Sequence, residues 1–326
     1  MIELKINNNE AGQRLDKYLF KYFKEAKASF IYKMLRKKNI VLNGKKSDGK
    51  DKLNQGDIVK VFMADETIAK FRGESVKFKT VKNPRINIVY MDDNIALINK
   101  EAGILSQKAS DSDISVNELF ISYLLNNKII TMESLNTFKP SIVNRLDRNT
   151  SGLICAGISL KGSQIMSEMF RDRTIDKYYL CLVKGKITEE QEIKGYLKKV
   201  ESTNKVEILD IPKDDSYSYI ETKYIPVCSS DEYTLLKVKL VTGKTHQIRA
   251  HLAYNNHPLV GDTKYGDKKC NAFFKEKYKL KHQLLHSYNM IINSEKLGLK
   301  NKNIIAEVPK IFDIIVYSEL NYKINK

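Results

Sequence analysis

Apolar residues near the N-terminus recur with the period of a helix. Leu15, Tyr18, Leu19, Tyr22 and Phe23 fall at positions i, i+3, i+4, i+7 and i+8, so one face of a helix would be apolar and the other polar. This spacing predicts an amphipathic helix that packs one face on a small core.

A second helix is predicted a few residues later, with Ser29 as its N-terminal cap. Its apolar face carries Ile31, Met34 and Leu35, and its other face carries Lys33, Arg36, Lys37 and Lys38. Short strands are expected over 40–42, closed by an Asn-Gly turn, and over 58–62. The polar segment 63–85 has no clean periodicity, so it predicts a linker between a domain at 1–62 and a second domain at 86–326.

The rest of the chain mixes strand and helix patterns. Strands are predicted over 86–91, 95–99, 153–158, 178–183 and 236–240, and helices over 114–130, 160–171 and 246–252. The run 178–183 is apolar on both faces, as in a strand buried on both sides. The segment 195–230 predicts loops and short strands. Because strands and helices alternate without regular βαβ spacing, the pattern favours an α+β fold over a doubly wound sheet.

Charge narrows the class of partner. The 326 residues carry a formal charge of +17 with a pI of about 9.4, and the first 62 residues hold 15 Lys and Arg against 7 Asp and Glu. This balance favours polyanions, nucleic acid first and anionic membrane second, although charge alone also fits a merely basic surface. Membrane adhesion would need an amphipathic apolar patch that the sequence does not show.

Other segments of the sequence argue against a secreted or membrane protein, a metal site and a phosphate-binding loop. The N-terminus lacks the apolar core of a signal peptide and no apolar run is long enough to span a bilayer, so a cytoplasmic protein is predicted. The four cysteines form no C-x-x-C pair, so no zinc site is expected. Thr242-Gly243-Lys244-Thr245 is no phosphate-binding loop, because the first glycine of that motif would fall at Val238. His246 and His251 lack the H-E-x-x-H pattern, which argues against a catalytic metal.

The candidate chemistry lies at 144–152, Asn-Arg-Leu-Asp-Arg-Asn-Thr-Ser-Gly. Asp147 stands between Arg145 and Arg148, and a carboxylate among cations stays ionised and can act as a nucleophile or a base. By residue chemistry alone, a solvated loop with a surface ion pair is also possible.

This stretch closely resembles the His-Arg-Leu-Asp-x-x-Thr-Ser-Gly signature of the RluA/RluC/RluD family of RNA pseudouridine synthases, with Asn144 in place of the usual His. Two further runs are similar to family motifs in the family's order. Residues 243–249 resemble Gly-Arg-Thr-His-Gln-Ile-Arg, with Lys244 for the first Arg, and continue into Gly261-Asp262 and Tyr265-Gly266. Residues 177–183 resemble Lys-x-Tyr-x-Ala-x-Val, with Cys181 for Ala.

Two more segments carry the resemblance. Residues 90–94 and 99–103 resemble the opening of the family's catalytic domain, with Glu101 where Pro is usual, and no catalytic consequence is expected from that change. Residues 1–62 resemble an S4 RNA-binding domain, most like the RluC branch. The resemblance implies a catalytic domain with a mixed, mostly antiparallel sheet.

The resemblance also implies roles for individual residues. Asp147 would be the nucleophile, Arg249 would keep it ionised and orient it through two hydrogen bonds, and Tyr179 would support the base. Arg145 would help to fill the space left by a flipped-out nucleotide. The implied substrate-binding residues are Arg145, Arg148, Thr150, Lys244, His246 and Gln247, and the implied RNA-binding residues are Lys33, Arg36, Lys37 and Lys38. His286, in a late Leu-His-Ser run, is expected to be structural.

The implied activity is the isomerisation of uridine in RNA by a monomer without a cofactor. The expected substrate is 23S large-subunit rRNA. The alternatives are a tRNA pseudouridine synthase and a non-catalytic RNA-binding factor of ribosome assembly. Whether the carboxylate attacks C6 of uracil or C1′ of ribose, or removes a proton from the sugar, stays open.

Overall fold

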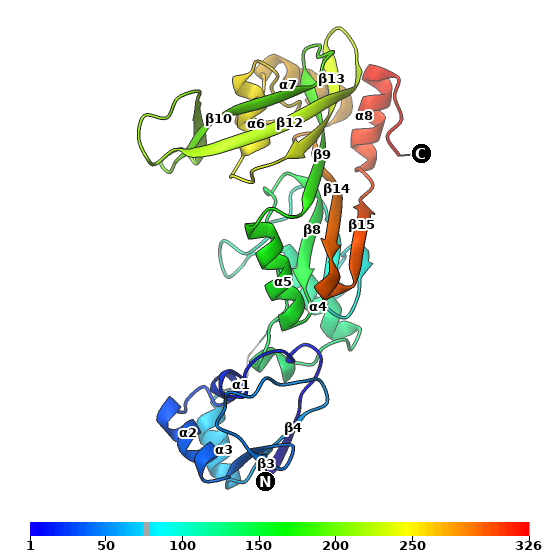
Figure 1. The fold of residues 1–326 in the computed structure, drawn as a ribbon. Coiled ribbons are helices and arrows are strands. Elements are labelled where there is room, and N and C mark those ends of the chain that lie inside the picture. The colour runs from blue at the N-terminus through cyan, green and yellow to red at the C-terminus, as the bar shows by residue number, and fades with distance from the viewer. Residues whose placement is uncertain (75–77, 326) are drawn as a thin grey trace.

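The computed structural model describes residues 1–74 and 78–325. A small N-terminal unit, residues 1–72, lies at one end of an elongated molecule, and the large unit, residues 78–325, holds the rest (Figure 1). No helix in the described part of the chain is long and apolar enough to cross a membrane.

The N-terminal unit packs three helices on a four-stranded antiparallel sheet of order β1-β4-β2-β3. Its strands are β1 (Ile2–Lys5), β2 (Ile40–Leu42), β3 (Lys45–Lys46) and β4 (Ile58–Val61), and its helices are α1 (Leu15–Tyr22), α2 (Ala28–Arg36) and α3 (Asp65–Arg72). The apolar stripe of α1 is buried, as its spacing predicts, because it faces the sheet and α2.

Two predictions for this unit are wrong. Helix α2 begins at Ala28, so Ser29 lies inside its first turn and caps nothing. The segment 63–85, predicted as a linker, contains α3. Ile68 is buried in the first core and the Phe71 ring packs on Phe30 at 4.3 Å between centroids, so the unit extends to residue 72 rather than 62. Two turns of helix with a single buried residue leave too weak a periodicity to read.

The large unit is built on an 11-stranded sheet. Its main path runs β11-β10-β12-β13-β9-β14-β8-β6-β5, with β15 on β14 and β7 on β8. Its strands are β5 (Ile88–Met91), β6 (Ile95–Lys100), β7 (Ser141–Ile142), β8 (Ser151–Gly157), β9 (Asp176–Lys184), β10 (Gln191–Val200), β11 (Lys205–Leu209), β12 (Ser218–Ser229), β13 (Tyr233–Leu240), β14 (Leu285–Ser294) and β15 (Leu299–Ile305). Its helices are α4 (Val116–Asn126), α5 (Leu160–Arg171), α6 (Gln247–Tyr254), α7 (Lys268–Tyr278) and α8 (Lys310–Leu320), with 3-10 turns at Ser134–Asn136 and Glu295–Leu297. Within the described residues only β14 and β8 pair in parallel in this sheet, which confirms the α+β class.

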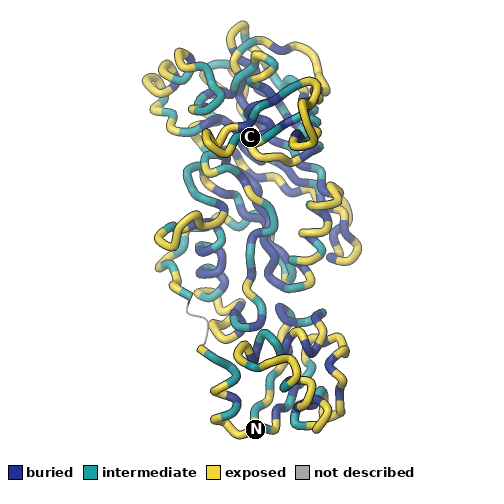
Figure 2. Tube along the Cα trace, turned by 90° about the vertical axis from the view of Figure 1, so that its left-hand side faces the viewer, coloured by how far each residue is buried: buried dark blue, intermediate teal, exposed yellow. Residues whose placement is uncertain are grey.

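Strand β9 lies in the middle of the sheet and is covered on both faces. Cys181 and Val183 belong to one core cluster, whereas Leu180 and Leu182 belong to another. Figure 2 shows the buried positions running through the centre of the large unit. The apolar run over 178–183 therefore reports burial on both sides, as predicted.

The segment 195–230 was predicted as loops and short strands; β11 is short, but β10 and β12 are long strands that cover much of the segment (Figure 1). Only one face of these strands is covered, and the outward positions carry charges that pair across strands, such as Lys223 with Glu192 at 2.6 Å. Charged and tyrosine side chains on the open face hide the alternation in the sequence.

Loop 7–10 joins the two units directly. The carbonyl oxygen of Asn9 accepts a hydrogen bond from Leu160 N at 3.1 Å, and Asn8 Nδ2 donates to the carbonyl oxygen of Asp93 at 3.0 Å. Arg72 also forms an ion pair with Glu133 at 2.6 Å. These contacts hold the N-terminal unit against the base of the large unit.

Candidate active site

The loop between β7 and β8 presents Asp147 at the surface of a rigid frame. Asn144 Oδ1 accepts a hydrogen bond from Cys155 N at 2.7 Å, so the residue that departs from the family signature ties the start of the loop to β8. Leu146 is buried, and its backbone N–H and C=O both bond to Ser106 Oγ. The Asp147 side chain remains about a quarter exposed, which lets it face a substrate.

The glycine that ends the Thr-Ser-Gly run is required by the close approach of two strands. Gly152 has φ of +107°, and a Cβ there would lie 2.3 Å from the carbonyl oxygen of Ser287 on β14. Only glycine fits this geometry. The approach allows β8 and β14 to pair and fixes where the loop leaves the sheet.

Lys100, at the end of β6, supports the same loop from inside. Its side chain is buried, and its ammonium donates to the carbonyl oxygens of Glu101, Ile104 and Arg148 at 2.9, 2.9 and 3.0 Å. Burial lowers the pKa of Lys100 to about 7, while the nearby Asp147 charge opposes this change. Lys100 thus bonds to the residue next to the candidate nucleophile.

Helix α6 brings the second motif to Asp147. His246 precedes the helix in a left-handed conformation, with φ of +56°. Gln247 is buried, and its side-chain amide donates to Glu221 O and Thr222 Oγ1 and accepts from Thr242 Oγ1 and Lys244 N. These four bonds fix the entry to α6, and Arg249, two residues further along the helix, reaches Asp147.

Arg249 links two carboxylates. Its Nη1 donates to Asp147 Oδ2 at 2.7 Å, whereas its Nε and Nη2 form a fork on Asp262 at 2.7 and 3.0 Å. The predicted contact with Asp147 is confirmed, but the expected pair of hydrogen bonds goes to Asp262 and Asp147 receives one. Asp147 Oδ2 carries this contact, and no described residue bonds to Asp147 Oδ1.

The hydroxyl group of Tyr265 forms a hydrogen bond with the imidazole ring of His246. The Tyr265 hydroxyl accepts from Val206 N at 2.8 Å, so its own proton is available to His246 Nδ1 at 3.0 Å. When the Tyr265 hydroxyl donates to Nδ1, the imidazole carries its hydrogen on Nε2, which lies 3.9 Å from Asp147 Oδ2. Burial is the main reason that the pKa of His246 is lowered, so the ring is neutral near pH 7.

Tyr179 lies on β9 and is 6% exposed. Burial raises the pKa of its hydroxyl to about 12, with Ser287 lowering it and the charge of Asp147 raising it. The phenol therefore stays protonated at neutral pH beside the carboxylate.

The other predicted site residues are less closely grouped. Arg145 and Lys244 are exposed. Arg148 is exposed too, and its Nε donates to the carbonyl oxygen of Gly103 at 3.1 Å. Thr150 is buried and accepts from Gln283 Nε2 at 3.1 Å.

Three residues at the site were given no role by the sequence: Lys100, Asp262 and Tyr265. Each lies in a segment that carries the family resemblance, and that was the available signal. His286, expected to be structural, is fully buried between Ser151 Oγ at 2.8 Å and the carbonyl oxygen of Ala306 at 3.1 Å.

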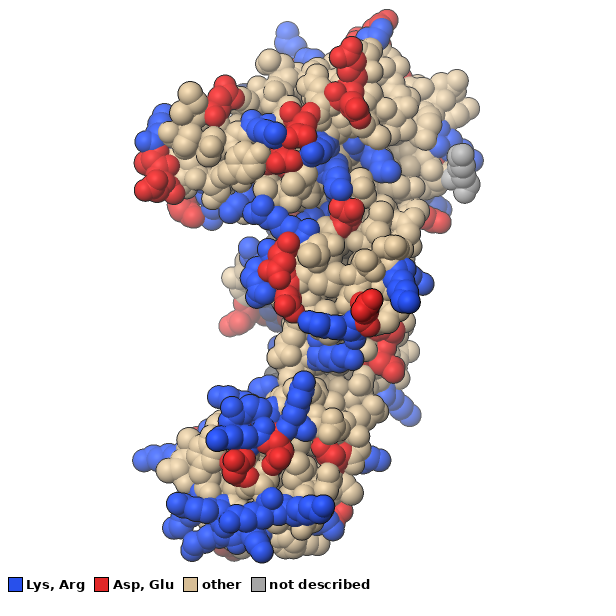
Figure 3. All heavy atoms as spheres, in the orientation of Figure 1, with Lys and Arg blue, Asp and Glu red and all other residues tan. Residues whose placement is uncertain are grey.

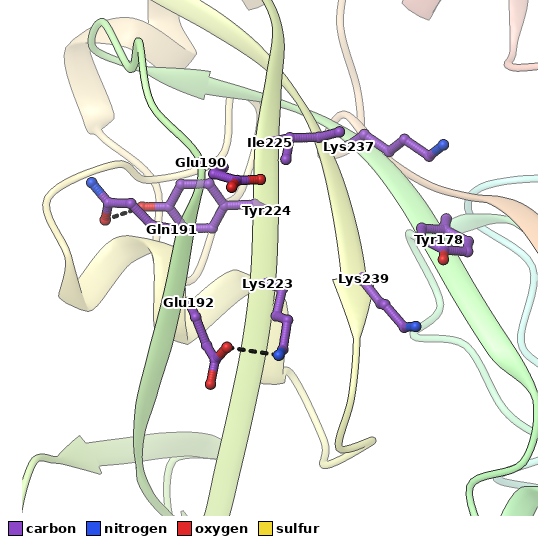
Figure 4. A pocket seen from close by; sticks show the side chains of 9 residues that line it. All are labelled: Tyr178, Glu190, Gln191, Glu192, Lys223, Tyr224, Ile225, Lys237 and Lys239. Carbon is purple, nitrogen blue, oxygen red and sulfur yellow. Dashed lines mark hydrogen bonds and ion pairs between the residues drawn. The ribbon is translucent and has the colours of Figure 1, made fainter.

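A hollow of about 490 Å³ lies elsewhere, over β9, β10, β12 and β13 (Figure 4). Tyr178 lines it, and because side chains alternate along a strand it faces away from neighbouring Tyr179. Two of its three lysines form ion pairs: Lys223 pairs with Glu192 at 2.6 Å and Lys239 with Asp176 at 2.8 Å. The hollow is not part of the Asp147 site.

Comparison with known proteins identifies the family to which this fold belongs. The family model described as RNA pseudouridylate synthase matches residues 94–254. A Mycoplasma capricolum protein described as an uncharacterized RNA pseudouridine synthase is 32% identical over 90% of this chain and 97% of its own length. The ribosomal large subunit pseudouridine synthase C of Pasteurella multocida is 31% identical over 90% of this chain and 87% of its own.

Another relative, the ribosomal large subunit pseudouridine synthase D of Borreliella burgdorferi, is 31% identical over 94% of this chain and 90% of its own. The solved structure of human RNA pseudouridylate synthase domain containing 4 has the same fold, with a TM-score of 0.58 and 18% identity over 74% of this chain and 95% of that chain. The chain therefore belongs to the RNA pseudouridylate synthase family. Its activity is the conversion of uridine to pseudouridine in RNA.

Proposed function

We propose that this enzyme modifies uridines of large-subunit ribosomal RNA, with Asp147 as the nucleophile on a flipped-out uridine. The main support is that the two oxygens of Asp147 have different surroundings. Oδ2 accepts a hydrogen bond from Arg249 at 2.7 Å, whereas Oδ1 has no partner among the described residues. The names of the similar synthases C and D support the choice of ribosomal RNA.

The reaction breaks the N1–C1′ bond of uridine, turns the uracil and forms a C5–C1′ bond. The proton lost from C5 balances the proton gained at N1, so the product is an isomer of the substrate. As the nucleophile, Asp147 Oδ1 attacks C6 or C1′; the alternative is that the carboxylate removes a proton from the sugar. Arg249 holds the other oxygen, and the Tyr179 hydroxyl supports the base as a neutral hydrogen-bond donor.

His246 and the exposed cations extend this site toward RNA. The Nε2–H of neutral His246 is a donor beside Asp147, suited to a carbonyl oxygen of the turning base. Exposed Arg145 would enter the space of the flipped nucleotide, and Arg148 and Lys244 would hold phosphates. Gln247 would need to release one of its four bonds to touch substrate, so we propose that it and buried Thr150 shape the site from below.

The N-terminal unit is proposed to act as an S4-like RNA-binding domain. Its four predicted RNA-binding residues on and just after α2 are all exposed: Lys33, Arg36, Lys37 and Lys38. Figure 3 shows Lys and Arg gathered over this unit, both at its outer end and on the side toward the large unit. A phosphate backbone could therefore bind along the basic surface of the N-terminal unit.

The function is tested by mapping pseudouridines in rRNA and tRNA with carbodiimide treatment and primer extension. Cells would carry the wild-type protein, Asp147→Asn, the exposed control Asp111→Asn, or no protein. We expect sites in large-subunit rRNA with wild type and control only, with Asp147→Asn still binding RNA. Sites confined to tRNA would refute the rRNA substrate, and product formed by Asp147→Asn would refute the nucleophile.

A further inference from the structure

Asp262 is the most completely engaged carboxylate near the site. Its side chain is 0% exposed, and its Oδ2 accepts from Arg249 Nε at 2.7 Å. Its Oδ1 accepts from Arg249 Nη2 at 3.0 Å and from the backbone N–H groups of Lys264 and Tyr265 at 2.8 and 3.1 Å. These bonds hold the pKa of Asp262 below its usual range although burial raises it, so the carboxylate is charged.

The fork on Asp262 decides how Arg249 can meet Asp147. A guanidinium and a carboxylate prefer two parallel hydrogen bonds when both are free to adopt them. Asp262 takes the Nε–Nη2 edge, and the Tyr265 ring lies against the guanidinium with 5.3 Å between Cζ and the ring centroid. Arg249 can therefore offer only Nη1 to Asp147, so one oxygen of the nucleophile stays free.

We propose that Asp262 is a positioning residue that prevents Arg249 from closing a two-bond fork on Asp147. Without the Asp262 carboxylate, the guanidinium is free to turn its Nη1–Nη2 edge onto both oxygens of Asp147. Both oxygens of Asp147 would then accept hydrogen bonds from Arg249, and these bonds would make the attacking oxygen less reactive. Asp262 never touches the substrate in this scheme and acts only through Arg249. The inference rests on the proposed role of Asp147 as the nucleophile.

Asp262→Asn is the direct test, because it keeps the side-chain volume but sets an amide N–H against an N–H of Arg249. We expect kcat for pseudouridine formation to fall by about tenfold or more, with KM and RNA affinity within about twofold of wild type. Asp267→Asn is the matched control, because Asp267 lies in the same segment and accepts a hydrogen bond from Cys270 N at the start of α7. A kcat for Asp262→Asn equal to that of this control would refute the proposal.

A double-mutant cycle separates positioning from a merely structural role. Lysine cannot form a fork, so in an Arg249→Lys background Asp262→Asn should lower kcat by less than about threefold. An equal loss in both backgrounds would mean that Asp262 acts by holding the turn at Lys264 and Tyr265, and the proposal would fail. Melting temperatures of all four proteins report the structural contribution separately.

A crystal structure of the variant tests the geometry without any activity. We expect Arg249 to contact both Oδ1 and Oδ2 of Asp147 in Asp262→Asn. A guanidinium still bonded through Nη1 to Oδ2 alone would overturn the proposal. If Asp262→Asn does not fold, Asp262→Ser takes its place, since its hydroxyl can accept from the turn and leaves room for water beneath Arg249.

The outcomes also distinguish this inference from the proposed function. Normal product from Asp147→Asn would overturn the nucleophile, and the positioning role with it. An inactive Asp147→Asn together with a fully active Asp262→Asn would leave the nucleophile standing and overturn the positioning role alone.

Discussion

Replacing Lys100 by methionine probes how the inside of the fold supports the reactive loop. Methionine keeps an unbranched apolar stem but removes the ammonium that donates to Glu101, Ile104 and Arg148. The carbonyl oxygen of Arg148 keeps its bond from Gly103 N at 2.9 Å. Each carbonyl left unpaired in a buried place costs about 1–3 kcal/mol, while removal of a buried charge recovers part of that loss. We expect the free energy of unfolding to fall by about 2 kcal/mol near neutral pH.

The difference in unfolding free energy between wild type and Lys100→Met should depend on pH. Burial lowers the pKa of Lys100 from 10.5 to about 7, so between these values the unfolded chain binds a proton that the folded chain has released. The free energy of unfolding then rises with pH, by at most about 1.4 kcal/mol per pH unit for this group. The variant lacks the group, so wild type should gain about 2 kcal/mol over it between about pH 7 and pH 9.

The assay is urea unfolding at several pH values, followed by far-UV circular dichroism because the chain contains no tryptophan. Lys108→Met, which removes an exposed lysine from the following loop, is the matched control and should run parallel to wild type. A constant difference between wild type and Lys100→Met across this pH range would refute the reasoning. The turnover number should also fall, because Arg148 adjoins Asp147 and its carbonyl oxygen would lose a partner.

The remaining predictions concern the histidine and the basic helix. Tyr265→Phe removes the donor that fixes the imidazole of His246, so we expect kcat to fall about tenfold with unchanged RNA affinity; an unaffected kcat in single-turnover assays would contradict the assigned tautomer. Replacing the four cations at 33 and 36–38 by glutamine should weaken RNA binding and reduce its salt slope by up to about 3, as filter binding over a salt series would measure. An unchanged slope would rule out that surface as an RNA contact.

The sequence determined the local elements and the motifs. The i, i+3, i+4 spacing predicted α1 and α2 because an apolar stripe on one side of a helix must be buried, whatever covers it. Strand β9 was recognised from a run that is apolar on both faces, which indicates burial on both sides of the sheet. Local patterns failed where the signal was short or masked: α3 holds one buried residue, and β10 to β12 keep one face in solvent.

The motifs placed Asp147, Tyr179 and Arg249 in a common site because their order resembles that of a known family. The contacts among them were not in the sequence. Arg249 was expected to give both hydrogen bonds to Asp147, and the fork goes instead to Asp262, which lies 13 residues beyond it. Burial and backbone N–H donors decide which carboxylate accepts the two parallel hydrogen bonds of Arg249, and only the folded turn supplies those donors.

The sequence by itself therefore determined the class of fold, the basic character of the N-terminal unit and the motifs that carry Asp147, Tyr179 and Arg249. These depend on residue type and local spacing. Only the tertiary structure decided which oxygen of Asp147 has no partner, which hydroxyl group meets the imidazole of His246, and that Lys100 supports the loop. Each of these is fixed by hydrogen bonds between segments far apart in the chain, and hydrogen-bond geometry exists only once the chain has closed around them.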